Sequence, residues 1–174
     1  MPVITPLRGT SGAIVFTDIV GFTEVTDTHG DEVALALLER QEELVRGSLP
    51  ECSRLVKELG DGLLLWFDDP CEAIVTCLSL QLAFENEIDA PVPLWVRIGV
   101  HWGCPTWRRE DIVGRDVNLA ARIMDLAGPG EVLCSHATVD AVGPLSGVTF
   151  EALGPVLVRG IAEPVGLARA IAAD

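Results

Sequence analysis

The stretch that decides the fold spans residues 13–23 and reads Ala13-Ile14-Val15-Phe16-Thr17-Asp18-Ile19-Val20-Gly21-Phe22-Thr23. Its first residues are mostly β-branched or aromatic, which is typical of a buried β-strand. Asp18 interrupts this apolar run, and an acid at the end of a buried strand is costly unless something positive meets it. Mg²⁺ would meet it well, because it prefers carboxylate oxygens and substrate phosphates, whereas a turn or capping role is the alternative. Gly21 breaks the run, and Thr23 is expected to cap a following helix.

The composition indicates one domain with a substantial aliphatic core. The chain has 174 residues, of which 49% are hydrophobic. There is no apolar run of membrane-spanning length and no signal-peptide pattern, and the five cysteines lack metal-ligand spacing. These features predict a cytoplasmic protein with reduced thiols. The net charge of -14 argues against nucleic acid and anionic membranes as partners, but a nucleotide held through a metal ion remains compatible with it.

Helix and strand patterns alternate along the chain. Residues 1–10 have two prolines and no periodicity, so we expect a lead-in to a single domain over residues 11–174. Apolar spacing predicts helices over residues 31–48, 69–89 and 116–127, and helical turns over 135–142. Strands are expected at residues 52–59, 63–67, 94–101 and 132–134, with two or three more between 148 and 171, whereas residues 102–113 read as an irregular link. This order predicts an α+β sandwich with a mixed or antiparallel sheet.

Asp61 lies between two glycines where the strand patterns 52–59 and 63–67 meet. An Asp-Gly junction is a strong hairpin signal, and the simplest role for Asp61 is a residue of a type I′ turn. If the first strand pairs with this hairpin, however, Asp18 and Asp61 converge. Two carboxylates at one place suit a pair of divalent cations that act on a phosphate.

Two further pairs suit nucleotide chemistry. Asn118 and Arg122 project from one face of the predicted helix 116–127. An amide donor and a guanidinium there would stabilise the charge that develops on a phosphoryl group. The alternative is that both side chains belong to a solvent-exposed helix face. Lys57 and Asp111 offer a donor and an acceptor that fit N1 and N6 of adenine and mismatch guanine. The alternative for these two is a strand-edge lysine and an ordinary loop acid.

Four motifs together resemble the catalytic domains of class III adenylate and guanylate cyclases, in particular small bacterial cyclases of actinobacterial type. The motifs are Phe16-Thr17-Asp18-Ile19-Val20-Gly21-Phe22-Thr23, Lys57-Glu58-Leu59-Gly60-Asp61-Gly62, Arg97-Ile98-Gly99-Val100-His101-Trp102-Gly103 and Asp111-Ile112-Val113-Gly114-Arg115-Asp116-Val117-Asn118-Leu119-Ala120-Ala121-Arg122. The resemblance runs from about residue 11 to the end. It implies a ferredoxin-like βαββαβ sandwich that works as a head-to-tail homodimer with active sites at the interface.

The resemblance also implies roles for individual residues. Two metal ions per active site, Mg²⁺ or Mn²⁺, would be held by Asp18, Asp61 and the backbone carbonyl of Ile19. Lys57 and Asp111 match the purine-specifying pair in its ATP form.

For the reacting part of the nucleotide, Asn118 and Arg122 match the pair that orients the ribose and stabilises the transition state. Phosphate contacts are implied for Gly21, Phe22, Thr23 and Arg159. Arg159 stands where the family often has a lysine, and a solvated surface arginine is the alternative.

One departure from the family concerns the segment from Gly103 to Asp111, which is shorter than the usual arm. That arm often grips the partner subunit, so its length bears on dimer strength. Trp102 and Trp107 would supply interface area instead, or pack within their own chain. Lys57 and Asp61 lie roughly 13 Å apart in an extended strand. This span favours their use in two different sites of a two-fold dimer.

The implied activity is that of an adenylate cyclase, in which the 3′-hydroxyl of ATP attacks its own α-phosphorus and 3′,5′-cyclic AMP and pyrophosphate leave. Alternatives are a catalytically weak, cyclase-like nucleotide-binding domain with a regulatory role, a guanylate cyclase, and phosphodiester chemistry like that of polymerase palm domains. Lys57 with Asp111 argues against GTP.

Overall fold

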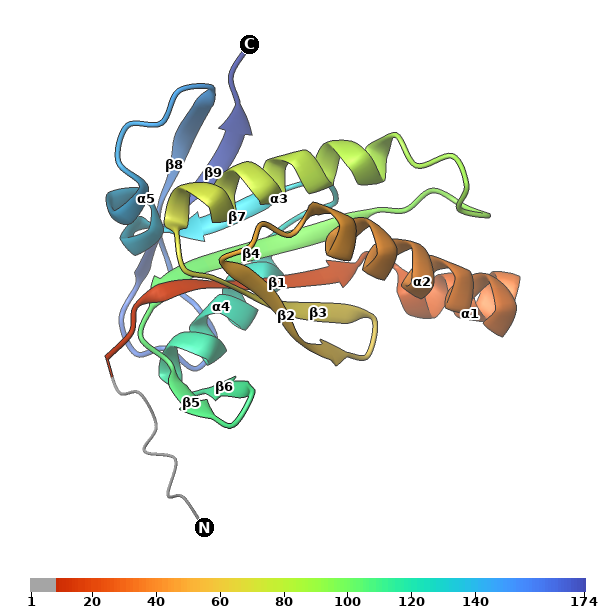
Figure 1. Cartoon of the computed structure of the whole chain (residues 1–174), viewed down its shortest axis with the longest axis horizontal. Helices are drawn as coiled ribbons and strands as arrows, with labels where there is room; N and C mark the ends of the chain where they lie inside the picture. The colour runs from red at the N-terminus through yellow and green to blue at the C-terminus, as the bar shows by residue number, and fades with distance from the viewer. Residues whose placement is uncertain (1–8) are drawn as a thin grey trace.

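The computed structural model describes residues 9–174 (Figure 1). The predicted lead-in of residues 1–10 falls almost wholly outside this range and stays a prediction. The elements in chain order are β1 (Gly12–Ile19), α1 (Phe22–His29), α2 (Asp31–Ser48), β2 (Ser53–Leu59), β3 (Gly62–Phe67), α3 (Pro70–Glu85), β4 (Val96–Gly103), β5 (Thr106–Arg108), β6 (Asp111–Val113), α4 (Arg115–Leu126), β7 (Val132–Ser135), α5 (His136–Val142), β8 (Val148–Val156) and β9 (Val165–Ala172).

Seven strands form one mixed sheet in the order β2-β3-β1-β4-β7-β9-β8. Neighbouring strands are antiparallel except β4 and β7, which run parallel. Strands β4, β1, β3 and β2 lie in that order, with α2 following β1 and α3 following β3 along the chain. This is the βαββαβ core that the resemblance implied, so the predicted α+β class and mixed sheet are confirmed.

Strand β1 is covered on both faces. Ala13, Val15 and Ile19 join the larger core, which α2 and α3 complete. Ile14 and Phe16 join a second cluster under α4 and the β5–β6 hairpin, which lie on the other side of the sheet from α3 (Figure 1). A strand buried on both faces reads as a continuous apolar run, as β1 does. Because side chains alternate along a strand, Asp18 shares the α4 face with Phe16.

Helix α3 begins where the sequence predicts. The side chain of Asp69 accepts a hydrogen bond from the backbone N–H of Glu72, and Pro70 occupies the first turn. Both are preferred helix starts, because they satisfy or remove an N–H that has no intrahelical partner. Within residues 9–174, none of the helices combines the length and the apolar character that spanning a bilayer requires.

Two local predictions are wrong. Thr23 does not cap a helix, because Gly21 is the N-cap of α1 with φ of 70°, a conformation that suits glycine. The supposedly irregular link 102–113 contains the end of β4 and the β5–β6 hairpin. Of the two or three C-terminal strands expected, two form, β8 and β9, and a register shift near Gly154 explains why the pattern of β8 reads as two pieces.

Candidate active site

Two carboxylates from separate segments meet at one end of β1. Asp18 lies opposite Gly62, the residue next to Asp61, in the antiparallel pair of β1 and β3. Gly62 permits the close approach, because a Cβ at this position would overlap the backbone carbonyl of Thr17. The predicted pairing of the first strand with the hairpin is therefore confirmed, and it brings the two acids together.

Gly60 sets the turn that carries Asp61. Its φ of 62° places it in the left-handed region, whereas Asp61 has no positive φ. A positive φ at the first central residue alone matches a type II′ turn rather than the type I′ turn considered from the sequence. The glycine takes the unusual backbone conformation, so Asp61 keeps an ordinary one at the tip of the hairpin.

The carboxylates are electrostatically crowded. The pKa of Asp61 is raised from 3.8 to about 6, chiefly by burial and then by the hydrogen bond and charge of Asp18, against the opposing charge of Arg97. Arg97 lies opposite Asp18 on β4. Its Nη2 and Nε donate to Asp18 Oδ2 at 2.7 and 3.1 Å. Two neighbouring acids that share one guanidinium favour additional positive charge.

This donor set fits divalent cations. Residues 9–174 hold no group of three or more His, Cys, Asp or Glu side chains placed to bind a metal. Asp18 and Asp61 therefore offer two carboxylates, and the remaining ligands would be backbone carbonyls, water and substrate. Mg²⁺ is commonly bound in this way, through one or two carboxylates together with substrate phosphates. The backbone carbonyl of Ile19, next to Asp18, is the predicted third protein ligand.

Helix α1 starts just after these carboxylates. Gly21 is its N-cap, and this residue supplies no side-chain cap to the N–H groups of the first turn. The backbone N–H groups of Phe22 and Thr23 consequently lack intrahelical partners, and such groups attract phosphates. The three predicted phosphate contacts thus lie at one helix N-terminus, within a few residues of Asp18.

Lys57 of β2 and Asp111 of β6 form an ion pair, with 2.9 Å between Nζ and Oδ2. The hydrogen bond from Lys57 is the main reason why the pKa of Asp111 lies below its usual value, so Asp111 is an ionised acceptor. The two side chains are 37% and 39% exposed, which leaves their polar ends accessible to a ligand. The structure thus brings the predicted purine contacts together within one chain.

Asn118 and Arg122 lie on the exposed side of α4. The opposite side of the helix buries Val117, Ala120 and Ile123. Arg122 Nη1 lies 3.5 Å from Asp125 Oδ2, and Asp125 in turn lies 3.8 Å from Arg97. Asp125 therefore links the predicted transition-state arginine to the side chain that contacts Asp18.

Comparison with known proteins identifies the family. The model described as "Adenylate and Guanylate cyclase catalytic domain" matches residues 8–167 of this chain. The chain belongs to this family. Among curated relatives of this class III cyclase domain, a pH-sensitive adenylate cyclase of Mycobacterium tuberculosis is 31% identical over 168 residues, which cover 94% of this chain and 42% of the relative. An adenylate cyclase of Streptomyces coelicolor is 35% identical over 131 residues, which cover 72% of this chain and 32% of that relative. The chain thus spans less than half the length of these relatives.

Solved cyclase structures share the fold. CyaB, an adenylyl cyclase of P. aeruginosa, aligns with a TM-score of 0.85 at 22% identity and covers 98% of each chain. The catalytic core of a rhodopsin-guanylyl cyclase with converted specificity, in complex with ATPalphaS, aligns with a TM-score of 0.87 at 19% identity, covering 98% of this chain and 100% of that one. Because adenylyl and guanylyl cyclases share this fold, the purine base has to be argued from side chains.

Two predicted features of this cyclase domain lie apart from the carboxylates. Arg159 is exposed in the segment between β8 and β9, and within residues 9–174 no ion pair joins it to another site residue. Trp107 packs edge to face on Trp66, with ring centroids 5.2 Å apart, and Arg54 stacks over it at 4.5 Å. Trp107 therefore packs within its own chain, and its predicted contribution to a dimer interface stays a prediction.

Arg97 contacts a candidate metal ligand but was not among the predicted site residues. Arg97 was named only as the first residue of one of the four family motifs, and no role was assigned to it. The signal that was available is that Arg97 is the one charged residue among Val96–Gly103, apart from the weakly basic His101. Its partner was not predictable, because that required the register between β1 and β4.

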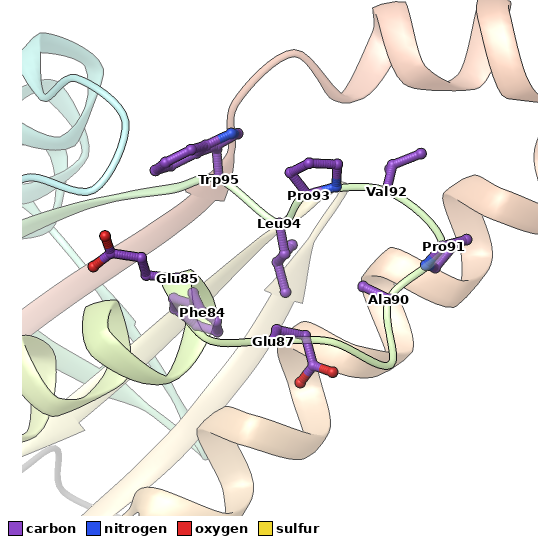
Figure 2. Close-up of a pocket in the computed structure, with 9 residues that line it drawn as sticks. All are labelled: Phe84, Glu85, Glu87, Ala90, Pro91, Val92, Pro93, Leu94 and Trp95. Carbon is purple, nitrogen blue, oxygen red and sulfur yellow. The ribbon is translucent and has the colours of Figure 1, made fainter.

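A cavity of about 310 Å³ lies beside the segment that links α3 to β4, and Figure 2 shows its lining. Phe84, Leu94 and Trp95 make much of this lining, and none of the predicted site residues belongs to it. The Trp95 carbonyl accepts a hydrogen bond from the N–H of Val20 at 2.8 Å. The cavity therefore adjoins the segment after Asp18 without containing the candidate site.

Proposed function

We propose that this domain is an adenylate cyclase that converts ATP into 3′,5′-cyclic AMP and pyrophosphate, at sites shared by two copies of residues 11–174. The observation that carries the choice of ATP is the Lys57–Asp111 pair at 2.9 Å. Lysine donates to N1 of adenine, and an ionised aspartate accepts from its N6 amino group. Guanine presents a donor at N1 and an acceptor at O6, so both contacts would be mismatched and the polar groups left unpaired.

The reaction forms one bond and breaks one at the α-phosphorus. The 3′-oxygen attacks and loses its proton, the bond from the α-phosphorus to the bridging oxygen breaks, and pyrophosphate leaves with that electron pair. Two Mg²⁺ or Mn²⁺ ions, held by Asp18, Asp61 and the Ile19 carbonyl, would lower the pKa of the 3′-hydroxyl and neutralise the phosphates.

The side chains of α4 orient and stabilise the reacting group. Asn118 holds the ribose so that its 3′-oxygen is aligned, because orientation supplies much of the acceleration in a self-attack reaction. Arg122 donates to the α-phosphate oxygens on which charge grows. The N–H groups of Gly21, Phe22 and Thr23 bind the β- and γ-phosphates, and Arg159 adds a positive charge at the rim.

Sites shared between two subunits are the part of the proposal that rests on the family resemblance. Lys57 lies two strands from β1, and its partner Leu64 lies opposite Phe16, two residues before Asp18. With ~4.8 Å between strands and ~3.3 Å per residue, Lys57 and Asp18 are roughly 12 Å apart in one chain. A head-to-tail dimer lets the carboxylates of one subunit and the base contacts of its partner serve one nucleotide.

The test is direct. The purified chain is incubated with Mn²⁺ and either ATP or GTP, and cyclic nucleotide and pyrophosphate are quantified. We expect cyclic AMP with equimolar pyrophosphate, and a preference for ATP over GTP in kcat/KM of at least ~100-fold. Preferential formation of cyclic GMP would make the domain a guanylate cyclase. A folded dimer that binds ATP without turnover would make it a regulatory nucleotide-binding domain.

A further inference from the structure

Gln41, near the middle of α2, is a buried amide that bonds at both ends. Gln41 is only 1% exposed. Its Oε1 accepts a hydrogen bond from Thr17 Oγ1 at 2.9 Å, and its Nε2 donates to the backbone carbonyl of Asp61 at 3.0 Å. The orientation of the amide is determined by these partners, because a backbone carbonyl only accepts.

The two partners of Gln41 flank the carboxylates. Thr17 directly precedes Asp18 on β1, and Asp61 carries the second carboxylate on the β2–β3 turn. The ladder between β2 and β3 ends with Leu59 opposite Gly62. Asp61 therefore lies beyond the last paired residues, where the turn alone would hold its carbonyl. Gln41 adds a second attachment, from a separate helix, to this end of the hairpin.

The chemistry of the α2 face supports a positioning role. The other buried residues of this helix are Ala34, Leu37 and Val45, all apolar. A buried amide is costly unless its polar atoms are paired, and an apolar side chain would fill the same space with no such requirement. We therefore attribute the presence of Gln41 at this position to its two hydrogen bonds rather than to the space that its side chain fills.

We propose that Gln41 is a positioning residue for the cation site: by bonding Thr17 and the Asp61 carbonyl together, it fixes the separation and orientation of the Asp18 and Asp61 carboxylates. This inference rests on the proposed function only in that the two carboxylates hold divalent cations. Residues that orient metal ligands through hydrogen bonds commonly change metal affinity by 10–100-fold when they are altered.

Three variants remove the bridge in different ways. Gln41→Met keeps the length and volume but has no polar atoms. Gln41→Asn keeps the amide but is one methylene shorter, so it cannot span both partners. Thr17→Val removes only the hydroxyl that bonds Oε1. Because each variant perturbs packing differently, a shared effect on cation binding is not explained by a folding defect of any one of them.

Thr138→Val is the matched control. Thr138 is fully buried, and its Oγ1 accepts from the Trp102 N–H at 3.0 Å and lies 3.1 Å from Ser135 Oγ. Trp102 pairs with Ala13, at the end of β1 remote from Asp18. This variant removes the same atom as Thr17→Val from an equally buried site, so it reproduces the loss of a buried hydrogen bond without touching the carboxylates.

The experiment measures binding of Mn²⁺ alone to the full chain, from the electron paramagnetic resonance signal of unbound Mn²⁺, with thermal melting to record folding. We expect Asp18→Asn to abolish the binding, the Thr17 and Gln41 variants to weaken it by about tenfold or more, and Thr138→Val to leave it unchanged. The inference is overturned if the Gln41 variants bind like the wild type, if Thr138→Val weakens binding equally, or if the wild type has no Asp18-dependent site.

Cyclisation of ATP is assayed in parallel to keep the two proposals separate. Gln41-dependent Mn²⁺ binding in a wild-type chain that makes no cyclic AMP would contradict the proposed function and leave the positioning role standing. If the wild type makes cyclic AMP but the Gln41 variants bind Mn²⁺ as tightly as the wild type, the proposed function stands and the positioning role of Gln41 is contradicted.

Discussion

Arg97 and Asp18 face each other across β4 and β1, and two guanidinium nitrogens of Arg97 contact the same oxygen of Asp18, at 2.7 and 3.1 Å. Asp61 adds a second carboxyl to this pair, so one cation serves two neighbouring acids. We therefore expect the balance of charge at this point to affect the stability of the metal-free domain and, if the proposed function holds, its affinity for divalent cations.

Replacing Asp61 by Asn should stabilise the metal-free domain at pH 8. The pKa of Asp61 is about 6 in the folded chain and 3.8 ordinarily, so ionisation of this carboxyl disfavours the folded state. The contribution of the protonated Asp61 carboxyl to the free energy of unfolding is fully present below pH 3.8 and is lost as the pH rises through 6. Asp61→Asn should therefore melt about 2–4 °C higher than the wild type at pH 8 and equally at pH 4, by calorimetry without divalent cations. A gain of equal size at both pH values would contradict this assignment.

Arg97→Gln should have the opposite effect on the same group. Losing the guanidinium leaves the two carboxyls uncompensated, so the pKa of Asp61 should rise above 6 and the free energy of unfolding at pH 7 should fall by about 1–2 kcal/mol. Chemical denaturation across pH 5–8 measures both. Arg169→Gln is the control. Arg169 lies on β9, which β4 and β7 separate from β1, and it forms ion pairs with the carboxylates of Glu131 and Glu151. This variant should leave the pH dependence assigned to Asp61 unchanged.

The double variant Lys57→Glu with Asp111→Asn should shift the purine preference. Glutamate at 57 accepts from N1–H of guanine, and the amide at 111 donates to O6. We expect the ratio of kcat/KM for ATP to that for GTP to fall by ~100-fold or more relative to the wild type. Steady-state kinetics with both nucleotides at saturating Mn²⁺ test this. Equal loss on both substrates would mean that the pair stabilises the fold without reading the base.

Gly99→Ala should displace α4 and with it the catalytic pair. A Cβ at Gly99 would overlap the backbone of Met124, so α4 rests directly on β4. Overpacking of this kind costs about 1–3 kcal/mol. Asn118 and Arg122 lie on α4, so its displacement would move both side chains away from the reacting group. We therefore expect kcat to fall at least tenfold while the variant still folds. Gly47→Ala is the control, since nothing lies within 4 Å of the added Cβ and its φ is ordinary; it should keep full activity.

Part of this architecture was predictable from the sequence because its signals are local. The apolar run of β1, the glycines around Asp61 and the Asp69-Pro70 helix start each follow from short-range rules, and all three elements form as expected. The pairing of Lys57 with Asp111 was suggested by their complementary chemistry and by the family resemblance, but no short-range rule predicts their contact, since the two residues are 54 positions apart.

Other features were not predictable because they depend on register and packing. α1 is only eight residues long, and Phe22 and Val25 are its only apolar residues, so its apolar stripe is too short to detect in the sequence. The β5–β6 hairpin has three residues per strand, and Arg109 takes a φ of 59° at its turn, where a sequence pattern suggests no glycine-like position. The contacts of Arg97 and Gln41 arise from strands and helices that meet only in the folded chain.

The proposed function requires that the carboxylates of one subunit and Arg122 of its partner act on the same nucleotide. The decisive measurement uses Asp61→Ala and Arg122→Ala chains that carry different affinity tags and are co-expressed, so that the heterodimer can be isolated through both tags. Each parent variant should be inactive. The heterodimer has both lesions in one site and none in the other, so we predict about half of the wild-type rate of cyclic AMP formation. A verified heterodimer as inactive as its parents would contradict the claim.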